Sequence, residues 1–185
     1  MATKSEILKH IVAALVVTVM NSAPSKAAED VSALLQQLQS ASEIDATRLE
    51  REIELAWSKS GSAAMDLLLQ RGRDAMQADD SAAAIEHLTA LTDHAPDFAE
   101  GWHARATAYF NAGLYGPALA DLQRALSLNP DNFNAIFGLG VMFQEFQDLG
   151  RAETAFRQVL ALHPHHENAK TALEQLKRSG IGRTL

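Results

Sequence analysis

Apolar and small residues recur along the chain with a period of 34 residues between Met65 and Pro164. In the central unit, counted from Ala99, positions 4, 7, 8, 11, 20, 24, 27 and 32 hold Trp102, Arg105, Ala106, Tyr109, Ala118, Leu122, Ala125 and Pro130. The next unit, counted from Phe133, has at the same positions Ile136, Leu139, Gly140, Phe143, Ala152, Phe156, Val159 and Pro164. The preceding unit, counted from Met65, has Leu68, Arg71, Gly72, Ala75, Ala84, Leu88, Leu91 and Pro96.

Each unit predicts two antiparallel helices, A and B, joined by a tight turn. The small residues at positions 8 and 20 let the two backbones approach, and large apolar residues at positions 4, 11 and 24 fill the space around that contact. The proline at position 32 ends helix B, because it lacks an amide hydrogen and disfavours helix at the residue before it. One pair cannot bury its apolar face alone, so the units are expected to stack into a solenoid.

The pattern over Met65–Pro164 resembles the tetratricopeptide repeat family. The resemblance implies an all-α solenoid of three helix-turn-helix repeats, 65–98, 99–132 and 133–166, whose helices A line a concave face. Some members of that family bind a C-terminal carboxylate through Lys at position 5 and Asn at position 9. Here position 5 holds Leu69, His103 and Phe137, and position 9 holds Arg73, Thr107 and Val141, so this mode of binding is not expected.

Other segments are predicted to flank the repeat region, residues 63–166. Residues 28–62 are expected to form an N-terminal helical hairpin, because Val31, Leu34, Leu35 and Leu38 follow helical spacing. Since terminal units of repeat arrays are atypical, this hairpin is expected to cover the exposed face of the first repeat. Residues 167–178 are predicted to form a C-terminal capping helix, followed by a flexible tail at 179–185.

The first 27 residues have the layout of a secretory signal peptide. Lys4 and Lys9 precede the ten-residue apolar run Ile11–Met20, and small residues at Ser25 and Ala27 suit cleavage before Ala28. The run is short for a bilayer span. An uncleaved membrane anchor and an N-terminal helix packed on the core remain as alternatives.

Charge and composition disfavour several classes of function. Without residues 1–27 the chain keeps 13 of its 16 basic and 22 of its 23 acidic residues, a net charge of −9, which disfavours a nucleic-acid partner. The absence of cysteine excludes disulfides and thiolate metal sites. No catalytic or phosphate-binding motif is present, so neither enzymatic activity nor a cofactor is expected.

A histidine cluster follows the third unit, at His163, His165 and His166. Imidazoles bind zinc, copper and nickel, but these residues lack a recognised ligand spacing. They are therefore expected to be solvated loop residues, with no specific metal site.

The exposed positions of helices A are expected to form a partner-binding groove. Its candidate residues are Leu69, Arg73, Met76, Glu100, His103, Thr107, Phe110, Asn134, Phe137, Val141 and Gln144. The apolar members, Leu69, Met76, Phe110, Phe137 and Val141, would form the floor of the groove. Asp66, Glu100 and Glu145 would form an acidic rim that favours a partner with basic residues beside an apolar anchor. Alternatively, the N-terminal hairpin or a second copy of the chain fills this groove.

The principal functional hypothesis is a non-enzymatic periplasmic adaptor that binds a protein or peptide. It follows from the predicted groove and signal peptide, and from a resemblance to small secreted tetratricopeptide repeat proteins of Gram-negative bacteria, notably alphaproteobacteria, some linked to cell-envelope integrity. One alternative is an assembly factor or complex subunit anchored in the inner membrane by an uncleaved N-terminal helix. A weaker alternative, based on the histidine cluster, is a periplasmic metal-handling protein.

Overall fold

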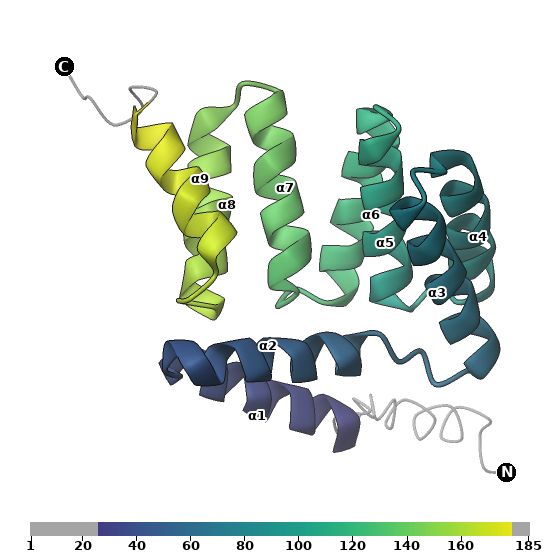
Figure 1. The fold of residues 1–185 in the computed structure, drawn as a ribbon, viewed down its shortest axis with the longest axis horizontal. Helices are drawn as coiled ribbons and strands as arrows, with labels where there is room; N and C mark the ends of the chain where they lie inside the picture. The colour runs from purple at the N-terminus through teal and green to yellow at the C-terminus, as the bar shows by residue number, and fades with distance from the viewer. Residues whose placement is uncertain (1–25, 179–185) are drawn as a thin grey trace, which may run out of the picture.

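The computed structural model describes residues 26–178, and within that range it is a stack of α-helices (Figure 1). The helices are α1 Lys26–Ser40, α2 Glu43–Trp57, α3 Ala63–Gln77, α4 Ser81–His94, α5 Ala99–Asn111, α6 Tyr115–Leu128, α7 Phe133–Glu145, α8 Leu149–Leu162 and α9 Glu167–Arg178. Helices α3 to α8 form three antiparallel pairs that stand side by side, and α9 packs against α8. The all-α solenoid predicted from the 34-residue period is thus observed.

The close contact inside each pair follows from its small residues. Ala84, Ala118 and Ala152, all at position 20, have no exposed surface. At position 8, an added Cβ on Gly72 or Gly140 would lie 2.5 Å from an atom of the Leu88 or Phe156 side chain, both at position 24. Any larger side chain at these two glycines would therefore separate helix A from helix B.

The turns between helices A and B are also equivalent from pair to pair. Position 15 is Asp79, Gly113 and Gln147 in the three units, and each has a positive φ, of 56°, 72° and 58°. In the first and third units an aspartate then caps helix B. Asp80 Oδ1 accepts from the Ala83 amide at 2.9 Å, and Asp148 Oδ1 accepts from the Arg151 amide at 3.1 Å.

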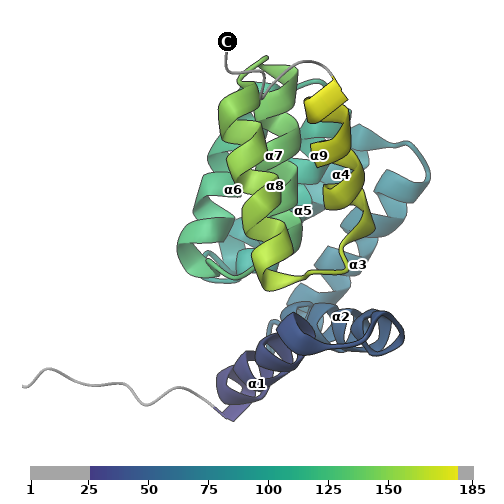
Figure 2. The ribbon, with the colours of Figure 1, turned by 90° about the vertical axis from the view of Figure 1, so that its left-hand side faces the viewer.

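The N-terminal hairpin, α1 and α2, does not lie on the first repeat, and that prediction was wrong. Helix α2 runs across one end of the repeat helices, with α1 packed against it (Figures 1 and 2). Its buried Leu49 and Ile53, with Leu38 of α1, join the apolar cluster that contains Phe133 and Leu173. The hairpin therefore packs on the third repeat and α9, where large apolar side chains are available to cover it.

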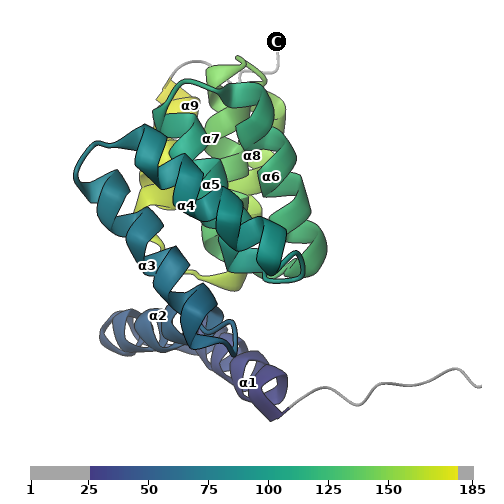
Figure 3. The ribbon, with the colours of Figure 1, turned by 90° about the vertical axis from the view of Figure 1, so that its right-hand side faces the viewer.

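Viewed from the side of the first repeat, a short connection after Trp57 leads from α2 into α3 (Figure 3). The exposed outer surface of α3 carries Leu67, which is 50% exposed. The predicted signal peptide and flexible tail lie outside the described residues, apart from Lys26 and Ala27, with which α1 begins. Among the described residues, no helix combines the length and the apolar character needed to cross a membrane.

Candidate partner-binding groove

Helices α3, α5 and α7 line a groove that α2 closes at one end. Its first part, here called the polar chamber, has a volume of about 530 Å³ and is lined by Arg51, Glu54, Leu55, Trp57, Ser58, Arg73, Met76, Glu100, His103, Ala104, Thr107 and Asn134. The second part, the apolar chamber, has a volume of about 350 Å³ and is lined by His103, Ala106, Thr107, Phe110, Leu122, Asn134, Phe137, Gly138, Val141 and Met142. His103, Thr107 and Asn134 belong to both linings, so the chambers adjoin.

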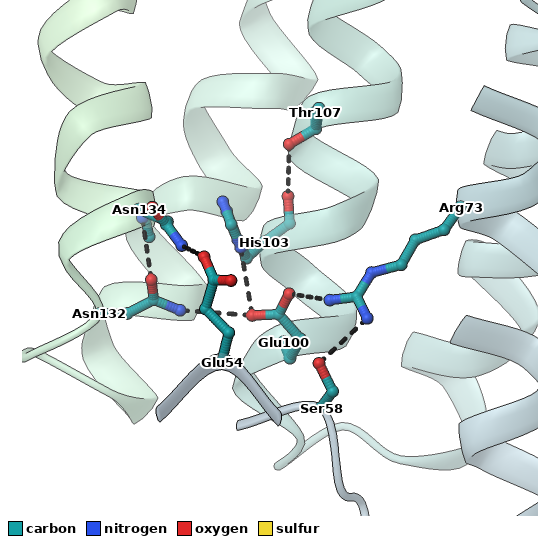
Figure 4. Close-up of polar contacts among 9 residues, drawn as sticks. Glu54, Ser58, Arg73, Glu100, His103, Thr107, Asn132 and Asn134 are labelled. Carbon is teal, nitrogen blue, oxygen red and sulfur yellow. Dashed lines mark hydrogen bonds and ion pairs between the residues drawn. The ribbon is translucent and has the colours of Figure 1, made fainter. Parts of the chain in front are cut away.

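A buried carboxylate, Glu100, organises the base of the polar chamber (Figure 4). Its oxygens lie 2.5 Å from Nη2 of Arg73, 3.2 Å from Nδ1 of His103 and 3.4 Å from Nδ2 of Asn132. Burial alone would raise the pKa of Glu100, but His103 and Arg73 outweigh it and hold that pKa below its usual value. Glu100 is therefore charged, and it links α3, α5 and the start of α7.

The hairpin is tied to this network at two points (Figure 4). Asn134 Nδ2 donates to Glu54 Oε1 at 2.7 Å, which joins α7 to α2. Arg73 Nη1 donates to the Ser58 hydroxyl at 3.0 Å, which joins α3 to the residue that follows α2. The end of α2 is consequently a fixed wall of the polar chamber.

The apolar chamber is open because small residues line part of it. Gly138 has no side chain, and a Cβ there would lie 3.3 Å from the Leu122 side chain. Phe110 of α5 and Phe137 of α7 both line the chamber and are half-buried. The Phe137 ring also packs on Phe156, with centroids 5.4 Å apart, so it supports the third repeat as well as the groove.

The structure places most of the candidate groove residues around the chambers and two of them outside both. Nine of the eleven candidates line a chamber, namely Arg73, Met76, Glu100, His103, Thr107, Phe110, Asn134, Phe137 and Val141. Leu69 is only 2% exposed and belongs to the core between α3, α4 and α5. Gln144 is half-buried and lines neither chamber. The α2 residues of the groove were missed, since the hairpin lies outside the repeat pattern that located the others.

The predicted acidic rim is wrong for Glu100, and Asp66, although charged, lines neither chamber. Glu100 is buried and already paired. Asp66 accepts hydrogen bonds from the Ser60 hydroxyl and amide, at 2.6 and 2.8 Å, which lower its pKa. Among the charged residues that line the polar chamber, Arg51 is exposed and Arg73 keeps 34% of its side-chain surface exposed. Arg73 is paired with Glu100, and Glu54, which also lines the chamber, is half-buried and accepts from Asn134, so the exposed charge there is that of Arg51.

The histidine cluster is not solvated as predicted. His163 and His166 are 2% and 7% exposed, and Nε2 of His165 lies 3.1 Å from the carbonyl oxygen of Ala41 in the hairpin. Within residues 26–178, no three His, Cys, Asp or Glu side chains are grouped so that they could hold a metal ion. Burial arises because the hairpin packs over this loop, a contact that local sequence does not reveal.

Comparison with known sequences agrees with the repeat pattern. Residues 99–132 and 134–166 match two family models described as tetratricopeptide repeat. A TPR repeat-containing protein of Rhizobium etli is 28% identical over 90% of this chain and 82% of its own length. The human Protein SGT1 homolog is 33% identical over 47% of this chain, which spans only 24% of that relative.

Solved structures agree with the fold. The Sgt2 TPR domain from Aspergillus fumigatus has a TM-score of 0.60 at 25% identity, covering 64% of this chain and 80% of that one. The second TPR domain of human RPAP3, in complex with an HSP70 peptide, has a TM-score of 0.55 at 27% identity, covering 58% of this chain and 90% of that one. Together with the equivalent helix pairs and their 34-residue period, these matches show that the chain has a tetratricopeptide repeat fold, with the repeat sequence matched over residues 99–132 and 134–166.

Proposed function

We propose that this protein is a non-enzymatic adaptor that binds a segment of a partner protein along the groove. The observation that carries the proposal is the pair of adjoining chambers, one polar and one apolar, on the face formed by helices A and closed at one end by α2. Grooves of this kind bind a segment through a few apolar anchors and the polar contacts around them. The peptide complex of the related human RPAP3 domain supports the same mode of binding.

The chambers favour a partner segment that combines an apolar side chain with an acidic group. Phe110, Phe137 and Val141 offer an apolar pocket, while Arg51 offers an exposed guanidinium group in the next chamber. Guanidinium groups bind carboxylates through paired hydrogen bonds. A partner with basic residues, as the sequence suggested, is not favoured, because Glu100 is buried and already paired with Arg73.

We further propose that the adaptor works in the periplasm, in a role connected with the cell envelope. The basis is the signal-peptide layout of residues 1–27. Mass spectrometry of the N-terminus in the native host tests it: a mature start at Ala28 is expected, and retention of the apolar run Ile11–Met20 would favour an inner-membrane anchor instead. The metal-handling alternative is not retained, because His163 and His166 are buried between helices.

A bulky residue at Thr107 tests the groove, because this exposed residue lines both chambers. Its hydroxyl donates to the carbonyl of His103 at 3.1 Å. Thr154 on α8 is also exposed and donates to Gly150 at 3.0 Å, so it is a matched control away from the groove. We expect Thr107→Trp to fold normally and to lose partner binding, whereas Thr154→Trp keeps it.

The measurement has two stages. Displayed random peptides are selected on the wild-type chain, and the enriched sequences are synthesised and titrated calorimetrically against all three proteins. We expect peptides with an apolar residue next to Asp or Glu, and at least tenfold weaker binding to Thr107→Trp. A photo-crosslinker placed at residue 107 in cells should capture a partner that the same group at residue 154 does not. Equal binding by both tryptophan variants would show that the groove is not the site.

A further inference from the structure

Two buried imidazoles lie where the hairpin meets the third repeat: His163 contacts Glu50 of α2, and His166 packs against the His163 ring. His163 is 2% exposed and His166 is 7% exposed. The His163 ring packs edge-on against Phe133, with centroids 5.3 Å apart, and Phe133 in turn contacts Trp57 of α2 at 5.0 Å. The docked hairpin therefore depends on an aromatic cluster with two titratable members.

His166 must be neutral at Nδ1 in this arrangement. Its Nδ1 accepts a hydrogen bond from the amide of Ala169 at 3.2 Å, and so caps the N-terminus of α9. A proton on Nδ1 would abolish that acceptor. It would also place a positive charge at the end of a helix where the macrodipole is positive. Protonation of His166 thus opposes the packing of α9.

His163 is likewise suited to the neutral form. Its Nε2 lies 3.4 Å from Glu50 Oε2 of α2, whereas its buried Nδ1 has no hydrogen-bond partner among the described residues. The neutral ring with its proton on Nε2 satisfies the contact with Glu50. A second proton, on Nδ1, would leave a buried donor without an acceptor, which is unfavourable.

Some charged groups around His163 and His166 favour protonation of these imidazoles, and others oppose it. Glu50 and Glu54 on α2 favour protonated imidazoles, while Lys170 on α9, His165 and the two imidazoles themselves, 5.4 Å apart, oppose a positive charge. Burial is the largest influence, and it lowers the pKa of both His163 and His166 below the ordinary value. The opposing effects are therefore stronger than the attraction of the glutamates.

We propose that this contact is a proton-sensitive latch, in which protonation of His163 and His166 releases the α1–α2 hairpin from the third repeat and opens the α2 wall of the polar chamber. In the released state both imidazoles are hydrated and titrate near their ordinary pKa of about 6.5. Because the released state binds protons more readily, docking is complete above that pH and is lost as the pH falls below it. This proposal does not depend on whether the groove binds a peptide.

The packing around the C-terminal end of α2 is compatible with release of the hairpin. Spaces of about 220 and 260 Å³ adjoin Trp57 on the side of the second repeat, next to Asn129. Two hydrogen bonds, from Asn134 to Glu54 and from Arg73 to Ser58, hold this end. Since the bonds are polar and partly exposed, water replaces them readily once the imidazole contact is lost.

Hydrogen exchange of the full chain tests the latch directly. Protection factors, which are corrected for the intrinsic effect of pH, are compared between about pH 7.5 and about pH 5 for α2 and for α5–α6. We expect α2 to lose at least tenfold more protection than α5–α6, since a proton bound only in the released state changes the docking equilibrium about tenfold for each pH unit below its ordinary pKa. Equal loss in both segments would mean general acid unfolding and would overturn the proposal, as would no loss in α2.

A non-titrating variant gives the second test. Asn at position 166 keeps a capping oxygen, and Gln at position 163 keeps a donor for Glu50, so His163→Gln with His166→Asn should remain docked at low pH. His94→Gln removes an exposed histidine of α4 and serves as the control. Because the sequence lacks cysteine, a dye pair at Ile44→Cys and Gln158→Cys, both exposed, reports the distance from α2 to α8.

In the wild-type background and in His94→Gln, acid should lengthen this distance in a growing fraction of molecules. In the double variant that fraction should fall at least fivefold. The same acid response in the double variant would show that these two histidines do not control the hairpin. If the double variant were undocked even at pH 7.5, the exchange comparison on the wild-type chain would decide alone.

Discussion

The repeats and the hairpin bury their apolar residues by different means. Within each repeat, a residue at position 20 with no exposed surface and a small residue at position 8 bring two neighbouring helices together. The hairpin has no such pair, and its Leu38 and Ile53 are buried instead against α7, α8 and α9, far away in sequence. The repeats are thus stabilised by local contacts, whereas the hairpin is stabilised by docking onto a surface that the repeats provide.

Two substitutions that leave similar cavities, one in the repeats and one in the hairpin, should show the largest difference in stability between these regions. Ile136 of α7 and Ile53 of α2 are 2% and 0% exposed, and both belong to the cluster under the hairpin. Ile136→Ala should lower the free energy of unfolding of the repeats by about 2–5 kcal/mol. Ile53→Ala leaves a similar cavity, but its cost to the repeats is limited, because the hairpin can leave the surface instead.

Denaturant melts and hydrogen exchange together distinguish the two variants. In Ile136→Ala, protection should fall throughout α5–α8, together with the midpoint of the melt. In Ile53→Ala, exchange should accelerate in α1–α2 while α5–α6 keep their protection. If both variants lowered the protection of α5–α6 equally, the hairpin would be part of one cooperative unit with the repeats.

The same difference explains what the sequence predicted. The helix pairs, the contact of Ala118 and the side of helix A that carries Thr107 and Val141 follow from a period that repeats three times. The position of the hairpin does not follow from the sequence, because Leu38 and Ile53 can bury the same apolar area against many different surfaces. The polar network was missed for a related reason: position in the repeat indicates the direction of Glu100, but not that Arg73 and His103 contact its carboxylate.

Substitution of two glycines of the third repeat tests the close contact between its helices, with a smaller expected change in stability. An added Cβ at Gly140 would lie 2.5 Å from Cε1 of Phe156, whose ring is fully buried. Gly140→Ala should therefore destabilise the repeats by about 1–3 kcal/mol. Gly150 of α8 has no atom within 4 Å of such a Cβ, so Gly150→Ala should be neutral or stabilising by about 0.5 kcal/mol. Denaturant midpoints of the two variants give the test, and equal midpoints would mean that helices α7 and α8 are not in close contact.

A comparison of the second and third repeats leads to the prediction with the smallest expected effect. Positions 7 and 23 hold Arg105 and Asp121 in the second repeat, but Leu139 and Ala155 in the third. Arg105 bonds Asp121 through Nε at 2.7 Å and Nη2 at 3.0 Å, so an ion pair joins α5 to α6. The bond to Asp121 raises the pKa of Arg105, so the guanidinium stays charged throughout the stable pH range.

The double variant Arg105→Leu with Asp121→Ala puts the apolar pair of the third repeat into the second. It should change the free energy of unfolding by less than about 1 kcal/mol, because a buried ion pair and an apolar pair of similar volume contribute similarly to stability. Asp121→Ala alone should cost about 3 kcal/mol, since it leaves the Arg105 side chain, only 12% exposed, without its carboxylate. The Thr92 hydroxyl, which accepts from Arg105 at 2.7 Å, keeps its own bond to the Thr89 carbonyl in the double variant. Denaturant melts of both variants measure the difference. A double variant as unstable as the single one would mean that the ion pair, and not the fit of positions 7 and 23, holds α5 against α6, and that the two repeats are stabilised differently despite their common period.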